Sequence, residues 1–266
     1  MEHIKSNYHT HTELCKHAKG MPVDFAQKAV EFNVQILGIS DHAPFKDVDF
    51  GYRMLFSELD LYCDAVDKAK SDFSDKVEIL KSLEIEYLPE YTKGKNYYEE
   101  LLTERKMDYL LLGEHFFRDS QGNLHNITSI QNTELAVEYA ESCAEAMKTG
   151  YFKIMAHPDL FCINEPFPWN DDYERCSDIL IENAIKNNVV LEYNANGLRR
   201  GKKNYPDGKR FQYPHERFWK KVKDAGLSAV AGSDAHNPDV LWDNAVETGI
   251  KTLAQLGINR IEKIKL

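Results

Sequence analysis

Short apolar runs alternate with amphipathic segments along the whole 266-residue chain. The apolar runs predict seven strands, at residues 6–11, 35–40, 77–87, 109–113, 152–156, 189–194 and 228–233. The segments between them predict helices, at residues 23–33, 57–72, 132–148, 171–186 and 214–225. Repeated strand-then-helix units are typical of a parallel sheet, which is either open and doubly wound or closed as a barrel.

Polar side chains stand at the ends of the predicted strands: His9, His11, Asp41, His42, Glu84, Glu86, Glu114, His115, His157, Asn194, Asn196, Asp234 and His236. Parallel strands all end on the same side, so these groups should converge at one mouth. An open sheet would spread them along a line, whereas a barrel gathers them in a ring. We therefore predict an α/β fold, a distorted TIM-like (β/α)7 barrel that residues 1–266 form as a single domain.

Histidine is the commonest of these polar residues. Of ten histidines, seven fall at or just after a predicted strand end: His9, His11, His17, His42, His115, His157 and His236. Residues two apart on a strand share a face and lie about 6.6 Å apart, a spacing at which the pair His9 and His11 can hold one cation. Imidazoles with the carboxylates of Glu84 and Asp234 suit Zn, Fe or Mn. This set is too large for one tetrahedral ion, so we predict two or three divalent ions.

A basic cluster, residues 199–203, follows the sixth predicted strand and should lie beside the same mouth. Arginine has a planar fork of donors that matches phosphate oxygens. We predict that Arg199 or Arg200 binds a phosphate, with Arg199 preferred. Lys202 and Lys203 are typical of a solvated loop.

The composition of the chain limits which binding partners and which cellular compartment we expect. The net charge of −10 disfavours long nucleic acids, although bound cations would still attract a small phosphorylated substrate. No segment approaches the roughly 20 apolar residues of a membrane span, and the first residues lack the apolar run of a secretory signal. Five cysteines without a Cys-x-x-Cys pair do not form a disulfide framework, which favours the cytoplasm. Cys15 could act as a thiol nucleophile, but small packing near the site is the commoner role.

The ordered motifs resemble those of the PHP (polymerase and histidinol phosphatase) superfamily, particularly its stand-alone histidinol-phosphate phosphatases. The similar segments extend over nearly the whole chain, at residues 9–12, 15–17, 40–44, 83–87, 113–115, 157–160, 194–199 and 233–236. The resemblance implies a distorted (β/α)7 barrel with up to three metal ions.

The resemblance also implies an assignment of ligands. One ion would be held by His9, His11, Glu84 and Asp234. Glu84 would bridge to a second ion, bound by His115 and His157. The third ion would be held by His17, His42 and His236. Glu86 lies on the same strand face as Glu84 and is its rival for the bridging role.

The implied activity is hydrolysis of a phosphate monoester, with histidinol phosphate of histidine biosynthesis as the leading substrate. Asp41 and nearby histidines without a metal are the candidates for the acid that protonates the leaving group, and Glu86 or Glu165 could meet a cationic amine. Residues 161–165 lack the basic side chains of related enzymes, so a second phosphate contact is missing or comes from Arg200 or Lys202. The alternatives are a nucleotide phosphodiesterase, a protein-tyrosine phosphatase, a metal-dependent amidohydrolase and a non-catalytic metal-binding module.

Overall fold

Seven parallel strands form the centre of the molecule. A computed structural model describes residues 4–164 and 167–266 of the chain. Its main sheet has the order β1-β2-β3-β4-β7-β8-β11, and each neighbouring pair is parallel. The strands are β1 (Ser6–Asn7), β2 (Ile36–Ile39), β3 (Glu78–Ile85), β4 (Tyr109–Leu112), β7 (Phe152–Met155), β8 (Val190–Asn194) and β11 (Ala229–Gly232). Each lies inside a predicted strand, which confirms all seven.

The first and last strands of this order meet and nearly close the sheet into a barrel. Just beyond their ends, Thr10 forms a parallel bridge with Ala235. The amide of His11 donates to the carbonyl of Ala235 at 2.9 Å, and the amide of Ala235 donates to the carbonyl of His9 at 3.3 Å. The distorted (β/α)7 barrel predicted from the sequence is therefore confirmed.

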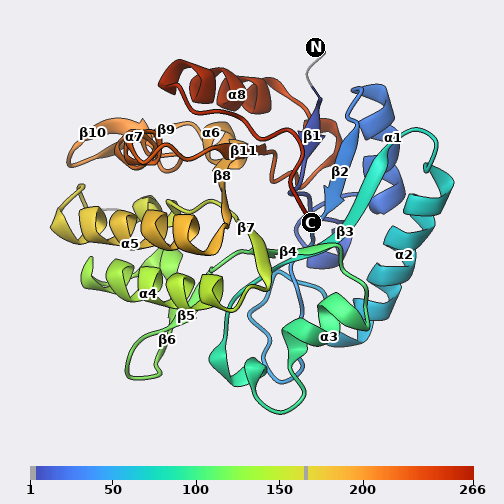
Figure 1. The fold of residues 1–266 in the computed structure, drawn as a ribbon, viewed down its shortest axis with the longest axis horizontal. Coiled ribbons are helices and arrows are strands. Elements are labelled where there is room, and N and C mark those ends of the chain that lie inside the picture. The colour runs from blue at the N-terminus through green and yellow to red at the C-terminus, as the bar shows by residue number, and fades with distance from the viewer. Residues whose placement is uncertain (1–3, 165–166) are drawn as a thin grey trace.

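Helices surround the barrel (Figure 1). Those that match predicted segments are α1 (Pro22–Glu31), α2 (Leu59–Asp72), α4 (Glu134–Lys148), α5 (Asp171–Asn187) and α7 (Glu216–Asp224). Outside the predicted segments lie α3 (Tyr97–Thr103), α6 (Ala195–Arg199), α8 (Asn244–Leu256) and two hairpins, β5 (Phe116–Arg118) with β6 (Leu124–Asn126) and β9 (Lys202–Tyr205) with β10 (Gly208–Phe211). Short 3-10 helices occupy connections, at Glu13–Cys15, Phe56–Glu58, Pro89–Thr92, Ile127–Ser129, Leu160–Ile163 and Pro238–Val240.

Alternate residues of the strands fill two apolar layers. In β4, Tyr109 and Leu111 belong to the smaller cluster inside the barrel, whereas Leu110 and Leu112 belong to the larger cluster shared with the helices. Successive side chains of a strand point to opposite faces, so a strand covered on both faces is apolar at nearly every position. The barrel interior is thus a packed core, and the predicted metal ligands lie at its carboxyl-terminal mouth.

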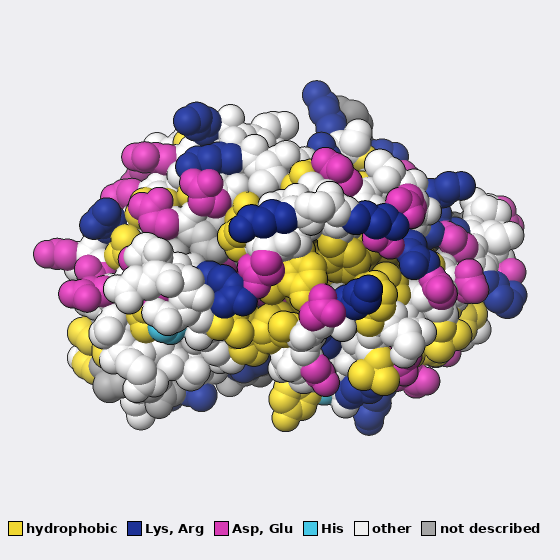
Figure 2. All heavy atoms as spheres, turned by 90° about the horizontal axis from the view of Figure 1, so that it is seen from below, with side chains coloured by type: hydrophobic (Ala, Val, Ile, Leu, Met, Phe, Trp, Pro, Cys, Tyr) yellow, Lys and Arg dark blue, Asp and Glu magenta, His cyan; other side chains and the backbone are white. Residues whose placement is uncertain are grey.

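The surface shows charges of both signs. On the face drawn in Figure 2, Lys and Arg side chains are interspersed with Asp and Glu, and hydrophobic side chains are exposed in a hollow between them. This face therefore has no broad surface of a single sign. Within residues 4–164 and 167–266, no helix combines the length and the apolar character needed to cross a membrane.

Candidate metal centre

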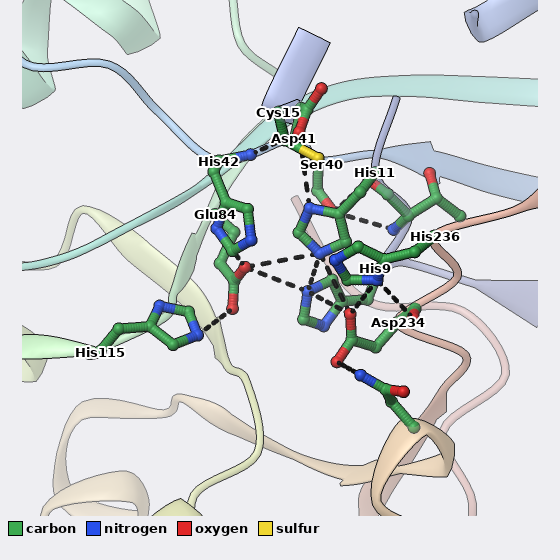
Figure 3. A network of polar contacts seen from close by, with 12 residues as sticks. His9, His11, Cys15, Ser40, Asp41, His42, Glu84, His115, Asp234 and His236 are labelled. Atoms are coloured by element: carbon green, nitrogen blue, oxygen red, sulfur yellow. Dashed lines mark hydrogen bonds and ion pairs between the residues drawn. The ribbon is translucent and has the colours of Figure 1, made fainter. Parts of the chain in front are cut away.

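The predicted metal ligands converge at the mouth of the barrel because each stands at or beyond the carboxyl end of a parallel strand. Figure 3 shows the imidazoles of His9, His11, His42 and His115 around the carboxylate of Glu84. His17, His157, Asp234 and His236 complete the group, so the structure brings all nine predicted ligands together.

Glu84, at the end of β3, lies at the centre of this group and is 1% exposed. Its Oε2 atom lies 3.0 Å from Nδ1 of His42, 3.4 Å from Nε2 of His9 and 3.5 Å from Nε2 of His11. The absence of a side chain at Gly113 makes room for it, because a Cβ atom there would come within 2.2 Å of the Glu84 side chain.

The other carboxylate oxygen of Glu84 faces different imidazoles. Its Oε1 atom lies 2.8 Å from Nε2 of His157 and 3.7 Å from Nε2 of His115. The two oxygens thus face two separate groups of nitrogen donors, which is the arrangement expected of a carboxylate that bridges two cations.

Asp234 completes the group around Oε2 of Glu84. Its Oδ1 atom lies 3.1 Å from Nε2 of His11 and 3.7 Å from Nε2 of His9, and these two nitrogens are 3.0 Å apart. Ligand atoms at about 2.1 Å from a tetrahedral zinc ion lie about 3.4 Å from one another. Each of the two nitrogens therefore lies at such a distance from the other nitrogen and from both carboxylate oxygens, as expected of ligands of a single ion.

A third group of donors lies nearer the solvent. Nε2 of His17 is 2.9 Å from Nε2 of His236, and His42 offers a nitrogen within 4.8 Å of both. His17 is exposed, and Nδ1 of His236 lies 3.3 Å from Oδ1 of Asp234. This group is open to the pocket, so an ion bound here would be accessible to a substrate.

Buried atoms without hydrogen bonds support a cation at this site. Within the described residues, Oε2 of Glu84 and Oδ1 of Asp234 are buried and make no hydrogen bond, although imidazole nitrogens lie close to both. Buried carboxylate oxygens normally have a partner. Close contacts that lack hydrogen-bond geometry are expected of atoms that share a metal ion, so the donor set is that of a divalent metal centre.

Opposite charges are balanced inside the cluster. Burial opposes protonation of His11, but the carboxylates of Asp234, Asp41 and Glu84 raise its pKa to about 9. Burial also opposes ionisation of Glu84, yet the imidazoles around it, that of His9 foremost, hold its pKa well below its usual range. Without metal, the protonated imidazoles of His9 and His11, whose pKa values are raised, offset the charge of the carboxylates, and a bound cation would take over this role.

Glu192 is a site residue that was not predicted. It lies on β8, is 1% exposed, and accepts a hydrogen bond from Nδ1 of His9 at 2.9 Å. Its other oxygen accepts from the amide of His157 at 3.1 Å and from Nδ2 of Asn194 at 2.8 Å. The available signal was an acidic residue within the otherwise apolar run 189–193, because a buried carboxylate needs polar partners.

Asp41 lies behind His11 and does not line the pocket. Its Oδ1 atom accepts from the amide of His42 at 2.8 Å and lies 3.5 Å from Nδ1 of His11. Its Oδ2 atom accepts from the amide and the hydroxyl of Thr12. Asp41 is therefore poorly placed as the acid for a leaving group, because both of its oxygens accept hydrogen bonds from the surrounding loop.

The carboxylate of Glu86 forms an ion pair with the guanidinium of Arg53. This carboxylate forms two hydrogen bonds of 2.9 Å with Arg53, which also donates to the carbonyl of Ala43. Burial opposes its ionisation, but the Arg53 charge and His115 lower the pKa of Glu86 to about 2. Glu84 therefore occupies the position between the imidazoles, while Oε1 of Glu86 lies 3.4 Å from Nδ1 of His115. Glu165, the other acid considered for an amine, lies outside the described residues.

The two arginines after β8 have different surroundings. Arg199 donates to the carboxylate of Asp243 at 2.8 Å and to both the carbonyl and the hydroxyl of Ser233, and it does not line the pocket. Arg200 lines the pocket, with its guanidinium 5.9 Å from the ring centroid of Tyr213. The structure therefore reverses the preference for Arg199, because the guanidinium of that residue is used to join α6 to the loop after β11.

Two further candidates are not positioned for chemistry. Lys202 lies over the ring of Phe211, 5.2 Å from its centroid, and does not line the pocket. The Cys15 thiol is fully buried, and burial raises its pKa far above the ordinary value. The thiol therefore stays protonated, which argues against a thiolate nucleophile.

A pocket of about 390 Å³ opens over the donor cluster. Its lining includes donor residues and two neighbours of them, namely His17, His42, Glu84, His115, His157, Asp234, His236, Asn196 and Arg200. Aromatic, aliphatic and further polar residues also line it, namely Phe50, Tyr52, Arg53, Phe116, Asn126, Thr128, Leu160 and Ile163. The volume and lining suit a small molecule with one anionic and one organic part.

A model of the PHP domain matches residues 7–196 of this chain. The chain belongs to the PHP domain family. The match extends from β1 into α6 and contains every candidate ligand except Asp234 and His236, which follow β11 and are brought to the site by closure of the barrel. The superfamily resemblance seen in the sequence is thereby confirmed.

Individual relatives of this PHP domain protein are named as phosphatases. The chain is 24% identical over 264 residues to a probable histidinol-phosphatase of Schizosaccharomyces pombe, with 86% of this chain and 80% of that protein covered. It is also 24% identical over 243 residues to a probable histidinol-phosphatase of Deinococcus radiodurans, with 86% and 85% covered.

A solved PHP structure has the same fold. The histidinol phosphate phosphatase of Lactococcus lactis, complexed with zinc, L-histidinol and phosphate, matches with a TM-score of 0.71 at 15% identity. The match covers 98% of this chain and 99% of that one. The distorted barrel is thus common to both over their whole lengths.

Proposed function

We propose that this PHP domain protein is a metal-dependent phosphatase that hydrolyses L-histidinol phosphate to L-histidinol and phosphate. The observation that carries the proposal is the buried Glu84, whose two oxygens face separate groups of imidazoles beneath a pocket that Arg200 lines. The names of the two relatives support this substrate and, with it, a role in histidine biosynthesis.

The proposed centre contains two or three ions of Zn, Fe or Mn. The first would be held by His9, His11, Glu84 and Asp234, the second by Glu84, His115 and His157, and the third by His17, His42 and His236. The short distances within each group and the buried oxygens without hydrogen bonds support this assignment.

When bound, such ions would supply a water molecule of lowered pKa and positive charge beside the phosphorus atom. The residues of the chain prepare the site for this chemistry. The side-chain Nδ2 atoms of Asn194 and Asn196 donate to Oδ2 of Asp234 at 3.2 and 3.1 Å, which turns Oδ1 toward the cluster. Arg200 would bind the non-bridging phosphate oxygens and offset the charge that develops as the ester bond breaks.

The test is phosphate release by freshly purified protein of measured metal content. Histidinol phosphate would be compared with phenyl phosphate, glycerol phosphate, phosphotyrosine and nucleotides, and the D234A variant would serve as the inactive control. We expect the highest kcat/KM for histidinol phosphate. A higher value for another ester would retain the metallophosphatase and exclude this substrate, and hydrolysis of amides without phosphate release would indicate the amidohydrolase alternative.

A further inference from the structure

Tyr52 has an unusual position at the mouth of the pocket. Its side chain lines the pocket and is 74% exposed, and its ring meets the ring of His17 edge-on at 5.4 Å. Its backbone has a φ of 50°, in the left-handed region that bulky residues rarely adopt. Strained backbone of this kind persists only where the surroundings enforce it, and it concentrates at functional sites.

The residues on either side of Tyr52 hold it in place. Phe50 stacks on Phe116, with ring centroids 4.4 Å apart and planes inclined by 11°. Arg53 is 6% exposed and is anchored by its paired hydrogen bonds to Glu86. The backbone of Gly51 and Tyr52 is therefore fixed on both sides, which places the exposed ring of Tyr52 at the edge of the pocket beside His17.

Besides the donor cluster and Arg200, the pocket is lined by aromatic rings, by Arg53 and by the neutral polar side chains of Asn126 and Thr128. Among the described residues that line it, the acidic ones are Glu84 and Asp234, and both belong to the donor cluster. A phosphate bound near that cluster and Arg200 would direct its organic group toward Phe50, Tyr52 and Phe116. Aromatic rings stack on other rings and attract cations, so they suit a planar, positively charged group.

We infer that Tyr52 is a specificity-determining residue whose ring stacks on an aromatic ring in the organic part of the substrate. The inference rests on the proposed function, in which that ring is the imidazole of histidinol phosphate. Stacking of this kind changes affinity by about three- to tenfold. The effect should fall mainly on KM, because the contact is formed equally before and during bond breaking.

The experiment compares Y52F, Y52A and Y52G with the control L55A. Leu55 belongs to the same loop and is 52% exposed, but it does not line this pocket. KM and kcat would be measured for histidinol phosphate, phenyl phosphate and glycerol phosphate. In Y52A and Y52G we expect KM for the two ring-bearing esters to rise about three- to tenfold relative to glycerol phosphate, while Y52F and L55A keep the wild-type ratio.

Y52G separates stacking from folding. Glycine adopts a positive φ without strain, so this variant should melt no lower than Y52A while losing the same discrimination. An equal loss on all three esters with reduced metal content would overturn the inference, since Tyr52 would then act through His17. Unchanged KM ratios would also overturn it. If the wild type hydrolyses phenyl phosphate but not histidinol phosphate, the proposed substrate fails, while the ratio of phenyl to glycerol phosphate still decides the role of Tyr52.

Discussion

Nδ1 of His9 donates a hydrogen bond to Oε1 of Glu192 at 2.9 Å, on the side of the ring that faces away from the donor cluster. A carboxylate can only accept, so the proton is held on Nδ1 and Nε2 is directed at Glu84 and Asp234. The contact requires a glycine at position 232, because a Cβ atom there would lie 1.7 Å from the Glu192 carboxylate.

Replacement of Glu192 should therefore weaken metal binding. Loss of a carboxylate that orients a ligating histidine typically lowers metal affinity about 10- to 100-fold, and we expect this for E192A. Competition with a chromogenic chelator measures the affinity. The matched control is E182A, at an exposed position of α5, which should bind metal like the wild type. Equal affinities in E192A and the wild type would contradict the positioning role.

Replacement of Glu84 should reduce metal binding and turnover, whereas replacement of Glu86 should reduce stability. E84Q should lose bound metal and at least about 10³-fold in kcat, because the carboxylate is shared by two groups of imidazoles. E86Q should lose stability instead, by about 3–5 kcal/mol, because it leaves the buried charge of Arg53 unpaired. Metal analysis and denaturant unfolding separate the two effects, and the reverse pattern would make Glu86 the bridging residue.

Arg200 and Arg199 form a second contrasting pair. R200A should lower kcat/KM about 10²-fold with an unchanged melting temperature, because this arginine lines the pocket. R199A should lower stability by about 1–3 kcal/mol, because it removes hydrogen bonds to Asp243 and Ser233. Steady-state kinetics and thermal unfolding of both variants provide the measurement. A selective loss of phosphate affinity in R199A would restore the original preference for that residue.

The stability of the metal-free protein should fall as the pH rises from about 6.5 to about 9. The pKa of His11 is raised from 6.5 to about 9 in the folded state, so its contribution is complete below pH 6.5 and is lost as the pH passes the folded value. Glu114 adds a change of the same sign, because burial raises its pKa to about 8. Urea unfolding of chelated protein at several pH values tests this trend.

The ligand variant H11Q offers the control for the pH effect. Without His11, the decline in stability of the chelated protein between pH 6.5 and 9 should be shallower. In the wild type, metal binding below pH 9 should release protons, which calorimetry in buffers of different ionisation enthalpy detects. A stability that rises with pH in the chelated wild type would contradict the protonated state assigned to His11.

Much of the site could be predicted because a regular pattern places it. Apolar runs such as residues 109–113 reveal buried strands, and in a parallel fold the residues that follow such strands must share one end. His115 and His157 were identified in this way, although they are far apart in the sequence. The helices α3 and α8 were missed, and their positions depend on packing against the barrel more than on a strong local pattern.

The sequence alone therefore determined seven buried strand segments and the metal-binding side chains at their ends. Tertiary structure decided which charged groups face one another. Arg53 binds Glu86, 33 residues away in the sequence, and His9 donates to Glu192, 183 residues away. Arg199 binds Asp243 instead of lining the pocket. The physical reason is that a buried charge is stable only beside its partner, and the identity of that partner depends on three-dimensional packing rather than on local sequence.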